Sequence, residues 1–318
     1  MSKSARNKPA DGATGVTASQ IDVSILIPTR DRCDDLRLTL KHLGRAAVPA
    51  GWRVELLVVD NGSSDDTKAV TMAAHLPNLE LRYLYDGRKG KSHAFQTGLE
   101  QARGRAVLFT DDDVHVPANW IEAMCGPIFD GRADAVQGGV RIAPHLERPW
   151  LKGVLRVWAA SVEDPVRPPQ GLVGANMATS SEAIAIAGPF DLRLGPGASG
   201  YFEDTVFGWA LERAGRKILY LPDVAVEHNF DPDRLQISAF MAAARRMALS
   251  RALVDRDIHP ERPPPSISAL LVQAPGLGVR GVTQLARYLF LRQPDPGFMS
   301  RYYRLKLWQA HRKLGRTS

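Results

Sequence analysis

The chain of 318 residues carries a net charge of +7; 24% of its residues are charged and 44% are hydrophobic. These values are typical of an ordinary globular protein with one large domain, or one domain and an appendage. Its two cysteines, Cys33 and Cys125, form no CxxC pair, which argues against a disulfide framework or a structural zinc site and fits a reducing compartment.

Residues 1–20 are rich in Ser, Ala, Gly and Lys and contain no apolar core, which indicates a disordered leader and not a signal peptide. Beyond them, strand and helix patterns alternate. We expect strands at 23–27 (ended by Pro28), 54–59, 79–83 and 106–110, and helices at 34–46, 64–76 and 92–103. This alternation predicts an α/β fold with a mostly parallel, doubly wound sheet.

Three consecutive acids, Asp111, Asp112 and Asp113, end the apolar strand at 106–110. Adjacent carboxylates repel each other and raise each other's pKa, and a divalent cation would relieve that repulsion. Ligands of open α/β sheets bind at the carboxyl ends of the strands, where these acids stand. Taken alone, the three acids fit a Mg²⁺ or Mn²⁺ site and a solvated, helix-capping loop equally well.

Polar residues also follow the first and second strands. Thr29, Arg30 and Asp31 come after Pro28, and Asp60 ends the second strand. Because the carboxyl ends of parallel strands meet at one edge of the sheet, we expect these clusters to converge there. A carboxylate such as Asp60 suits hydrogen bonding to a nucleobase or ribose; a turn residue is the alternative, because a strong turn dipeptide follows it.

Farther along the chain, a glycine-rich segment at 195–200 precedes Glu203 and Asp204, which open an expected helix. Acids in a first turn often only complement the helix dipole, but beside a flexible loop they can present a general base. His228 follows an expected strand at 224–227, and a histidine at that position is either structural or part of a metal site.

Taken together, these segments resemble glycosyltransferase family 2, the inverting nucleotide-sugar enzymes of GT-A fold. The resemblance covers about residues 23–228. It rests on the order and spacing of six segments: Ile27-Pro28-Thr29-Arg30-Asp31-Arg32, Val58-Val59-Asp60-Asn61-Gly62-Ser63-Ser64-Asp65, Phe109-Thr110-Asp111-Asp112-Asp113, Gly174-Ala175-Asn176-Met177, Gly188-Pro189-Phe190-Asp191 and Glu203-Asp204.

The resemblance implies a role for each matched position. Asp204 would be the general base that takes the proton of the acceptor hydroxyl, with Glu203 beside it. Asp113, Asp111 and His228 would hold Mn²⁺ or Mg²⁺ on the donor's diphosphate. The nucleotide sugar would contact Pro28, Thr29, Arg30, Asp31, Asp60 and Asp112, and also the metal-binding Asp111.

Two segments depart from the family pattern. Gln96-Thr97-Gly98 stands where many members have Arg-Asn or Ala-Asn, and Ser180-Ser181 stands where many carry basic residues. Lys91 and Arg88 are therefore the candidates to contact the donor's phosphates. The sequence contains no QxxRW motif and no membrane helices after the domain, which favours transfer of a single sugar over processive synthesis.

The charge is unevenly distributed. From Arg234 onward there are fifteen Lys and Arg against four Asp and Glu, whereas residues 1–233 carry a net charge of −4. With prolines clustered at 260–265, this predicts a boundary between residues 21–256 and a basic, mostly helical appendage at 257–318. The resemblance implies that 21–256 is a GT-A domain with an acceptor-side extension. The appendage would contact anionic membrane at its inner face, or pack onto the domain through Tyr302, Leu305 and Trp308.

The leading hypothesis is a cytoplasmic, metal-dependent, inverting glycosyltransferase. It would move one sugar from a nucleotide donor to a hydroxyl on a glycan, a lipid-linked acceptor or a small molecule, and it would not bind nucleic acid. A catalytically decayed nucleotide-binding scaffold is the first alternative, and a nucleotidyltransferase of the same fold is the second. Release of pyrophosphate in place of a nucleoside diphosphate would identify the nucleotidyltransferase.

Overall fold

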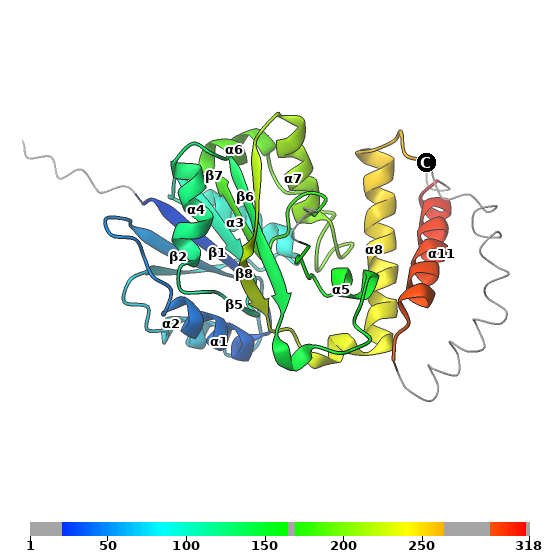
Figure 1. Cartoon of the computed structure of the whole chain (residues 1–318), viewed down its shortest axis with the longest axis horizontal. Coiled ribbons are helices and arrows are strands. Elements are labelled where there is room, and N and C mark those ends of the chain that lie inside the picture. Colours follow the sequence, from blue (N-terminus) through cyan, green and yellow to red (C-terminus); the bar gives the residue numbers. More distant parts are fainter. Residues whose placement is uncertain (1–20, 165–168, 264–292, 316–318) are drawn as a thin grey trace, which may run out of the picture.

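The computed structural model describes residues 21–164, 169–263 and 293–315. At its centre lies an eight-stranded, mostly parallel sheet in the order β3-β2-β1-β4-β7-β6-β8-β5 (Figure 1). Only β7, against β4 and β6, and β5, against β8, run antiparallel to their neighbours in the described sheet. The strands are β1 (Val23–Thr29), β2 (Val54–Asp60), β3 (Glu80–Tyr85), β4 (Ala106–Thr110), β5 (Val114–His115), β6 (Ala135–Ile142), β7 (Asn176–Ser180) and β8 (Ile218–His228).

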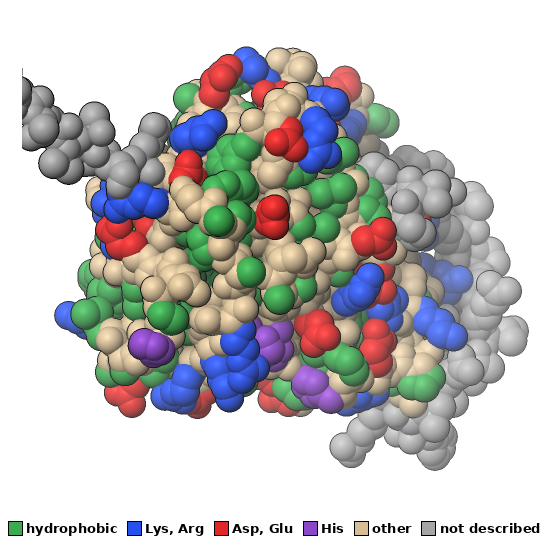
Figure 2. Space-filling model, turned by 60° about the vertical axis from the view of Figure 1, so that its left-hand side comes forward, with side chains coloured by type: hydrophobic (Ala, Val, Ile, Leu, Met, Phe, Trp, Pro, Cys, Tyr) green, Lys and Arg blue, Asp and Glu red, His purple; other side chains and the backbone are tan. Residues whose placement is uncertain are grey.

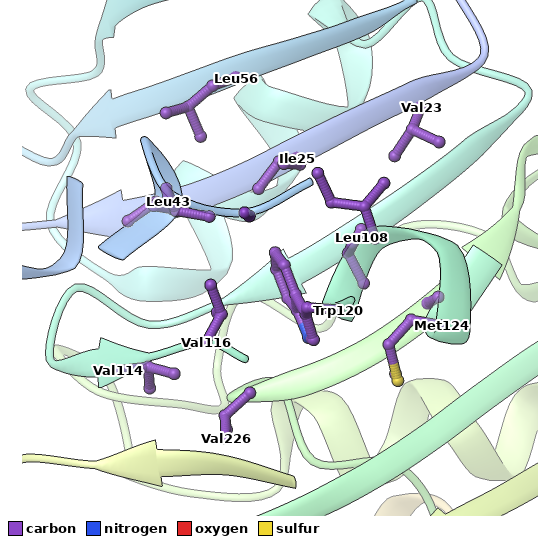
Figure 3. Close-up of a cluster of buried hydrophobic side chains, with 14 of the residues drawn as sticks. Val23, Ile25, Leu43, Leu56, Leu108, Val114, Val116, Trp120, Met124 and Val226 are labelled. Carbon is purple, nitrogen blue, oxygen red and sulfur yellow. The ribbon is translucent and has the colours of Figure 1, made fainter. Parts of the chain in front are cut away.

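The described helices lie on both faces of the sheet and in a third group beside it. They are α1 (Cys33–Leu43), α2 (Thr67–Met72), α3 (Lys91–Gln101), α4 (Trp120–Phe129), α5 (Val154–Trp158), α6 (Ser181–Ala187), α7 (Glu203–Arg213), α8 (Ile237–Asp257) and α11 (Pro296–Leu314), with 3-10 turns at Pro144–Leu146 and Pro232–Leu235. α1, α2 and α4 pack into the core on one face, where Trp120 lies among sheet residues such as Leu108 and Val226 (Figure 3). α3, α6 and α7 pack into the core on the other face.

The alternation of side chains along the central strands builds these two cores. Ile25 and Ile27 of β1 belong to the first core, while Leu26 between them belongs to the second. β1, β2 and β4 are buried along their whole length, as central strands of a parallel sheet should be. The predicted α/β fold is thereby confirmed.

Two predicted elements had wrong bounds. β1 continues through Pro28 to Thr29, because its pairing with β4 ends at Leu26 and the missing N–H of Pro28 costs no hydrogen bond on that side. The helix expected at 64–76 begins only at Thr67 and ends at Met72. The Ser and Asp residues before it bond to the turn after β1 and do not extend the helix.

The described part of the C-terminal region contains α8 and α11, and α11 lies beside α8 (Figure 1). Met299 is completely buried between these helices and α5, and Tyr302 packs there while its hydroxyl accepts a hydrogen bond from Arg245 at 2.9 Å. Leu305, by contrast, is exposed. No described helix combines the length and apolarity needed to cross a bilayer. The leader at 1–20 and much of the segment after 257 lie outside the described residues, so the domain division and the membrane contact stay predictions.

Candidate active site

Several of the predicted site residues stand at strand ends on the carboxyl-terminal edge of the sheet. Thr29 ends β1, Asp60 ends β2 and His228 ends β8, while the three adjacent acids follow β4 directly. β1 lies between β2 and β4, and β8 reaches the acids through its pairing with β5. The three acids make different contacts and divide into two groups.

Asp112 and Asp113 are buried, and one arginine holds both. Arg32 Nη1 lies 2.9 Å from Asp112 Oδ1, and its Nη2 lies 2.7 Å from Asp113 Oδ2. Thr29 Oγ1 donates to Asp112 Oδ2 at 2.8 Å. Burial raises the pKa of Asp112 to about 7, although Arg32 opposes the shift. At Asp113 the effect of burial is outweighed by His228 and by the arginines, so the pKa of this carboxyl is lowered.

His228 adjoins this pair through one ring nitrogen. Its Nδ1 lies 3.0 Å from the carbonyl oxygen of Ala159, an arrangement that assigns Nδ1 as the donor. In the neutral ring Nε2 then carries the lone pair, and it lies 3.3 Å from Asp113 Oδ2 and 3.4 Å from Arg234 Nη1. A proton or a cation beside Nε2 would relieve the repulsion between its lone pair and the carboxylate oxygen.

These residues fit a divalent cation that binds together with a phosphate-bearing substrate. Asp113 Oδ1 is buried without a hydrogen-bond partner, and the imidazole nitrogen of His228 stands beside the same carboxylate. Within the described ranges, no three His, Cys, Asp or Glu side chains are grouped to enclose a metal ion. Mg²⁺ at substrate phosphates typically takes only one or two carboxylate ligands from the protein, so two donors suffice.

Asp111 belongs to a second group, built around a buried lysine. Lys91 opens α3, where its ammonium contacts Asp111 and lies 5.1 Å from the centre of the Phe95 ring. Burial lowers the pKa of Lys91, but Asp111 and the two acids of α7 outweigh burial, so the net shift is upward. Lys91 therefore remains an ammonium between the acidic triplet and α7.

Glu203 and Asp204 open α7 as an acidic pair. Asp204 Oδ2 accepts from the Gly174 N–H at 2.8 Å, and its Oδ1 accepts from the Thr205 N–H at 2.7 Å. Burial and the neighbouring carboxylate raise the pKa of Glu203 to about 8. Burial also raises the pKa of Asp204, which the Gly174 N–H partly offsets. A carboxylate of raised pKa that is oriented by backbone amides suits a general base.

An unusual backbone turn presents these acids. Phe202, directly before α7, has φ +77°, in the left-handed region that bulky side chains rarely adopt. A Cβ on Gly195, at φ +85°, would lie 2.9 Å from the carboxyl carbon of Glu203. In the same glycine-rich loop, the Pro196 carbonyl accepts from the Lys91 N–H at 2.9 Å. The loop thus packs against both α3 and the acids of α7.

Asp60, at the carboxyl end of β2, accepts a hydrogen bond from a tyrosine. Tyr83 Oη donates to Asp60 Oδ2 at 2.7 Å, and the Ser63 N–H donates to Asp60 Oδ1 at 2.8 Å. Burial and Asp60 raise the pKa of Tyr83, so its hydroxyl stays a donor. The remaining acceptor capacity of Asp60 is what an N–H or O–H of a nucleoside would use.

Asp31 fastens the turn after β1 to the turn after β2. Its carboxylate accepts from the Ser64 N–H at 2.7 Å, and its own φ is +51°, a value that Asp tolerates better than most residues. Arg30 is exposed beside it, with Nε 3.4 Å from Asp31 Oδ2. Pro28 is buried within β1. Of these predicted nucleotide contacts, Arg30 and Asp31 are accessible.

The two departures from the family pattern fall in different places. Thr97 Oγ1 and Arg88 Nε both donate to the buried carboxylate of Asp86, at 2.7 and 2.9 Å. Arg88 is therefore already paired, although 59% of its side chain is exposed. Ser180 pairs with Ala106 at the amino end of β4, so this departure lies at the opposite edge of the sheet from the acids.

Sequence analysis assigns no role to two arginines that the structure places at the acids. Arg32 contacts both Asp112 and Asp113, and Arg234 Nη1 lies 3.9 Å from Asp113 Oδ2 while its guanidinium lies over the Phe230 ring. Both residues follow strands that end at the site edge, which is the signal that could have found them. In Figure 2, His side chains lie on the lower part of the face shown, among both basic and acidic side chains, in the direction in which β6 and β8 run in Figure 1.

Known proteins resemble the chain in sequence and in structure. Residues 24–167 match the family model described as Glycosyl transferase family 2. Glycosyltransferase AglE of Haloferax volcanii is 32% identical over 37% of this chain and 39% of its own length. Succinoglycan biosynthesis protein ExoM of Rhizobium meliloti is 26% identical over 67% of this chain and 69% of its own length. Mannosyltransferase PcManGT from Pyrobaculum calidifontis, in complex with GDP-Man and Mn²⁺, has a TM-score of 0.59 at 19% identity, covering 92% of this chain and 88% of that one.

The mostly parallel sheet and its likeness to PcManGT define a GT-A fold. The family match over residues 24–167 and the curated relatives support a glycosyltransferase of family 2. The chain spans less than half the length of AglE. The family and the fold predicted from the six sequence segments are thus confirmed.

Proposed function

We propose that the chain is a metal-dependent, inverting glycosyltransferase that moves a single sugar from a nucleoside-diphosphate donor to an acceptor hydroxyl. One observation carries the proposal: the carboxyl edge holds two acidic clusters with different chemistry, one at Asp113 and one at Asp204. Asp113 lies with His228, and Asp204 lies with Glu203, while Lys91 contacts Asp111 between them.

Each group suits one half of the reaction. Asp113 and His228 would hold a Mn²⁺ or Mg²⁺ ion, which when bound neutralises charge on the leaving diphosphate. Asp204 accepts the proton of the acceptor hydroxyl while that oxygen bonds to the anomeric carbon and the bond to the diphosphate breaks. This single displacement inverts the anomeric centre. Lys91, as an ammonium, adds positive charge beside the site of bond cleavage.

Similar proteins support the substrate classes. PcManGT was solved with a nucleotide sugar and Mn²⁺ on the same fold, and ExoM is described as a protein of succinoglycan biosynthesis. A nucleotide sugar as donor and a glycan, lipid-linked or small-molecule hydroxyl as acceptor are therefore the substrates we propose. The donor's nucleoside would lie at Asp60 and Asp31.

The first test is a thermal-shift panel of UDP, GDP, CDP and dTDP, each with and without Mn²⁺. We expect one nucleotide to stabilise the wild-type protein only when Mn²⁺ is present, by about 2.7 kcal/mol at a hundred times its Kd. Asp113→Ala should remove the metal-dependent part of the shift, because the unpartnered Oδ1 is lost.

The control for this panel is Asp130→Ala, which changes an exposed acid paired with Arg132 at the end of α4 and should leave the shift unchanged. The same proteins are then assayed for nucleoside diphosphate release from the matching nucleotide sugar. Nucleotide binding with no release from any sugar donor would favour the decayed scaffold. Pyrophosphate release would favour the nucleotidyltransferase. Full activity of Asp113→Ala would overturn the proposed metal site.

A further inference from the structure

Arg32 makes an unusual set of contacts at the candidate metal site. It precedes α1, and its guanidinium reaches three carboxylates: Asp35 in the first turn of α1, and the buried Asp112 and Asp113 after β4. The separations are 3.0, 2.9 and 2.7 Å. The planar fork of an arginine can satisfy several carboxylate oxygens at fixed angles, which makes this geometry specific to arginine.

These contacts leave one carboxylate oxygen without a partner. Asp112 uses Oδ1 for Arg32 and Oδ2 for Thr29, so both of its oxygens have partners. Asp113 directs Oδ2 at Arg32, and His228 approaches the same oxygen at 3.3 Å. Asp113 Oδ1 is buried and accepts no hydrogen bond. The arginine therefore fixes the rotation of the Asp113 carboxylate and the identity of its unpartnered oxygen.

We propose that Arg32 is a positioning residue for the metal, which holds Asp113 so that Oδ1 alone faces the cation. This inference rests on the metal-dependent function proposed above. Arg32 remains on Oδ2 when the cation binds and does not compete with it for the same oxygen. Partners of this kind, which orient a metal ligand without touching the metal, typically contribute 10–100-fold to metal affinity.

The decisive variant is Arg32→Lys, which keeps the positive charge and removes the fork. A change in metal affinity then reports geometry, because the electrostatic repulsion between this residue and the cation is preserved. Free Mn²⁺ is measured by electron paramagnetic resonance while the full chain is titrated, in the presence of the nucleoside diphosphate that the thermal-shift panel identifies. We expect Arg32→Lys to weaken Mn²⁺ binding by about 10-fold.

The matched control is Arg37→Lys, the same substitution on α1 at an exposed residue paired with Asp34, and it should bind Mn²⁺ as the wild type does. Nucleotide binding without Mn²⁺ is measured in parallel. A variant that only loosened the fold would weaken both ligands, whereas the loss expected for Arg32→Lys is confined to the metal. Melting curves without ligand establish that each variant is folded.

Two results would overturn the inference in distinguishable ways. If the wild type takes up Mn²⁺ and Arg32→Lys binds it equally well or more tightly, then Arg32 is a competitor or a bystander, and the proposed function stands without it. If the wild type takes up no Mn²⁺ with any of the four nucleotides, then the metal dependence of the proposed function fails, and the positioning role fails with it.

Discussion

Two buried glutamates at opposite edges of the sheet have pKa values that are shifted in opposite directions. Glu55 lies near the amino end of β2, and it accepts from Ser24 Oγ at 2.6 Å, from Arg82 Nη1 at 2.9 Å and from Arg103 Nε at 2.9 Å. Burial by itself would raise the pKa of Glu55, but the hydrogen bonds from these three residues outweigh it, so the pKa is lowered.

Glu203 is buried at the carboxyl edge in the opposite electrostatic setting. Burial and the charge of Asp204 raise its pKa to about 8, and Lys91 offsets only part of that shift. At the structural carboxylate Glu55, hydrogen bonds from neighbouring side chains offset the cost of burying its charge. A buried acid left with a raised pKa, beside a second one in the first turn of a helix, is the pattern expected where chemistry requires a proton to move.

The largest effect predicted from this comparison is on Asp204. Asp204→Asn keeps the shape of the side chain and its place near the Gly174 N–H, but the amide does not accept a proton from the acceptor. General bases typically contribute about 10²–10⁴-fold, so kcat should fall by that factor while nucleotide affinity stays constant. Steady-state kinetics with a sugar donor and acceptor measure this change.

Glu182→Gln provides the matched control, since Glu182 also stands in the first turn of a helix, α6, but is 76% exposed and paired with Arg216. Its kcat should equal that of the wild type. If Asp204→Asn remained fully active in a folded protein, the assignment of Asp204 as the base would fail. The raised pKa values at the carboxyl edge would then not be evidence for catalysis.

The second prediction concerns stability at the opposite edge. Glu55→Gln should lower the free energy of unfolding by about 3 kcal/mol near neutral pH, because it removes a buried charge from two arginines that remain charged. Activity per folded molecule should not change, since Glu55 lies at the edge away from the acids of the site. Urea denaturation measures the loss.

Glu80→Gln tests whether the loss of stability in Glu55→Gln comes from the burial of the glutamate or only from its ion pair with an arginine. Glu80 also contacts Arg103, but it is exposed at the start of β3. An exposed ion pair contributes about 1 kcal/mol or less, so this variant should lose far less stability than Glu55→Gln. Equal losses would contradict the view that Glu55 is special because it is buried and fully bonded.

How much the sequence predicted depends on how local each signal is. The strands ending at Asp60 and Thr110, and the helix that Glu203 opens, follow from hydrophobic runs and first-turn acids that lie within a few residues of one another. The start of α2 was predicted three residues too early, at residue 64. Asp65 accepts from the Cys33 N–H, a contact between residues far apart in the sequence, and does not join the helix.

The contacts inside the site were not predictable in this way. Arg32 meets Asp112 and Asp113 only because β1 and β4 are neighbours in a register that pairs Leu26 with Phe109. The packing of Met299 against α8 likewise depends on a return of the chain that no periodicity encodes. Sequence patterns identified which residue types reach the edge, but the pairing between them is a property of the assembled sheet.

The last prediction compares the two glutamates through the pH dependence of the free energy of unfolding. In the unfolded chain Glu203 ionises near its ordinary value of 4.5, whereas the folded protein holds the proton up to about pH 8. The folded state binds more protons between these values, so Glu203 makes the free energy of unfolding fall as pH rises. Glu203→Gln does not ionise and should lose less stability between about pH 5 and about pH 9 than the wild type.

Because each unit of pKa shift corresponds to about 1.4 kcal/mol, the difference between wild type and Glu203→Gln at about pH 9 should exceed about 1 kcal/mol. Glu55→Gln should show the opposite trend: Glu55 contributes stability above its unfolded pKa that is lost as pH falls, so its replacement costs less in acid. Chemical denaturation across pH measures both slopes. If the free energy of unfolding changed with pH equally in Glu203→Gln and in the wild type, Glu203 would ionise in the ordinary range. The two glutamates would then differ in their contacts but not in the direction of their pKa shifts.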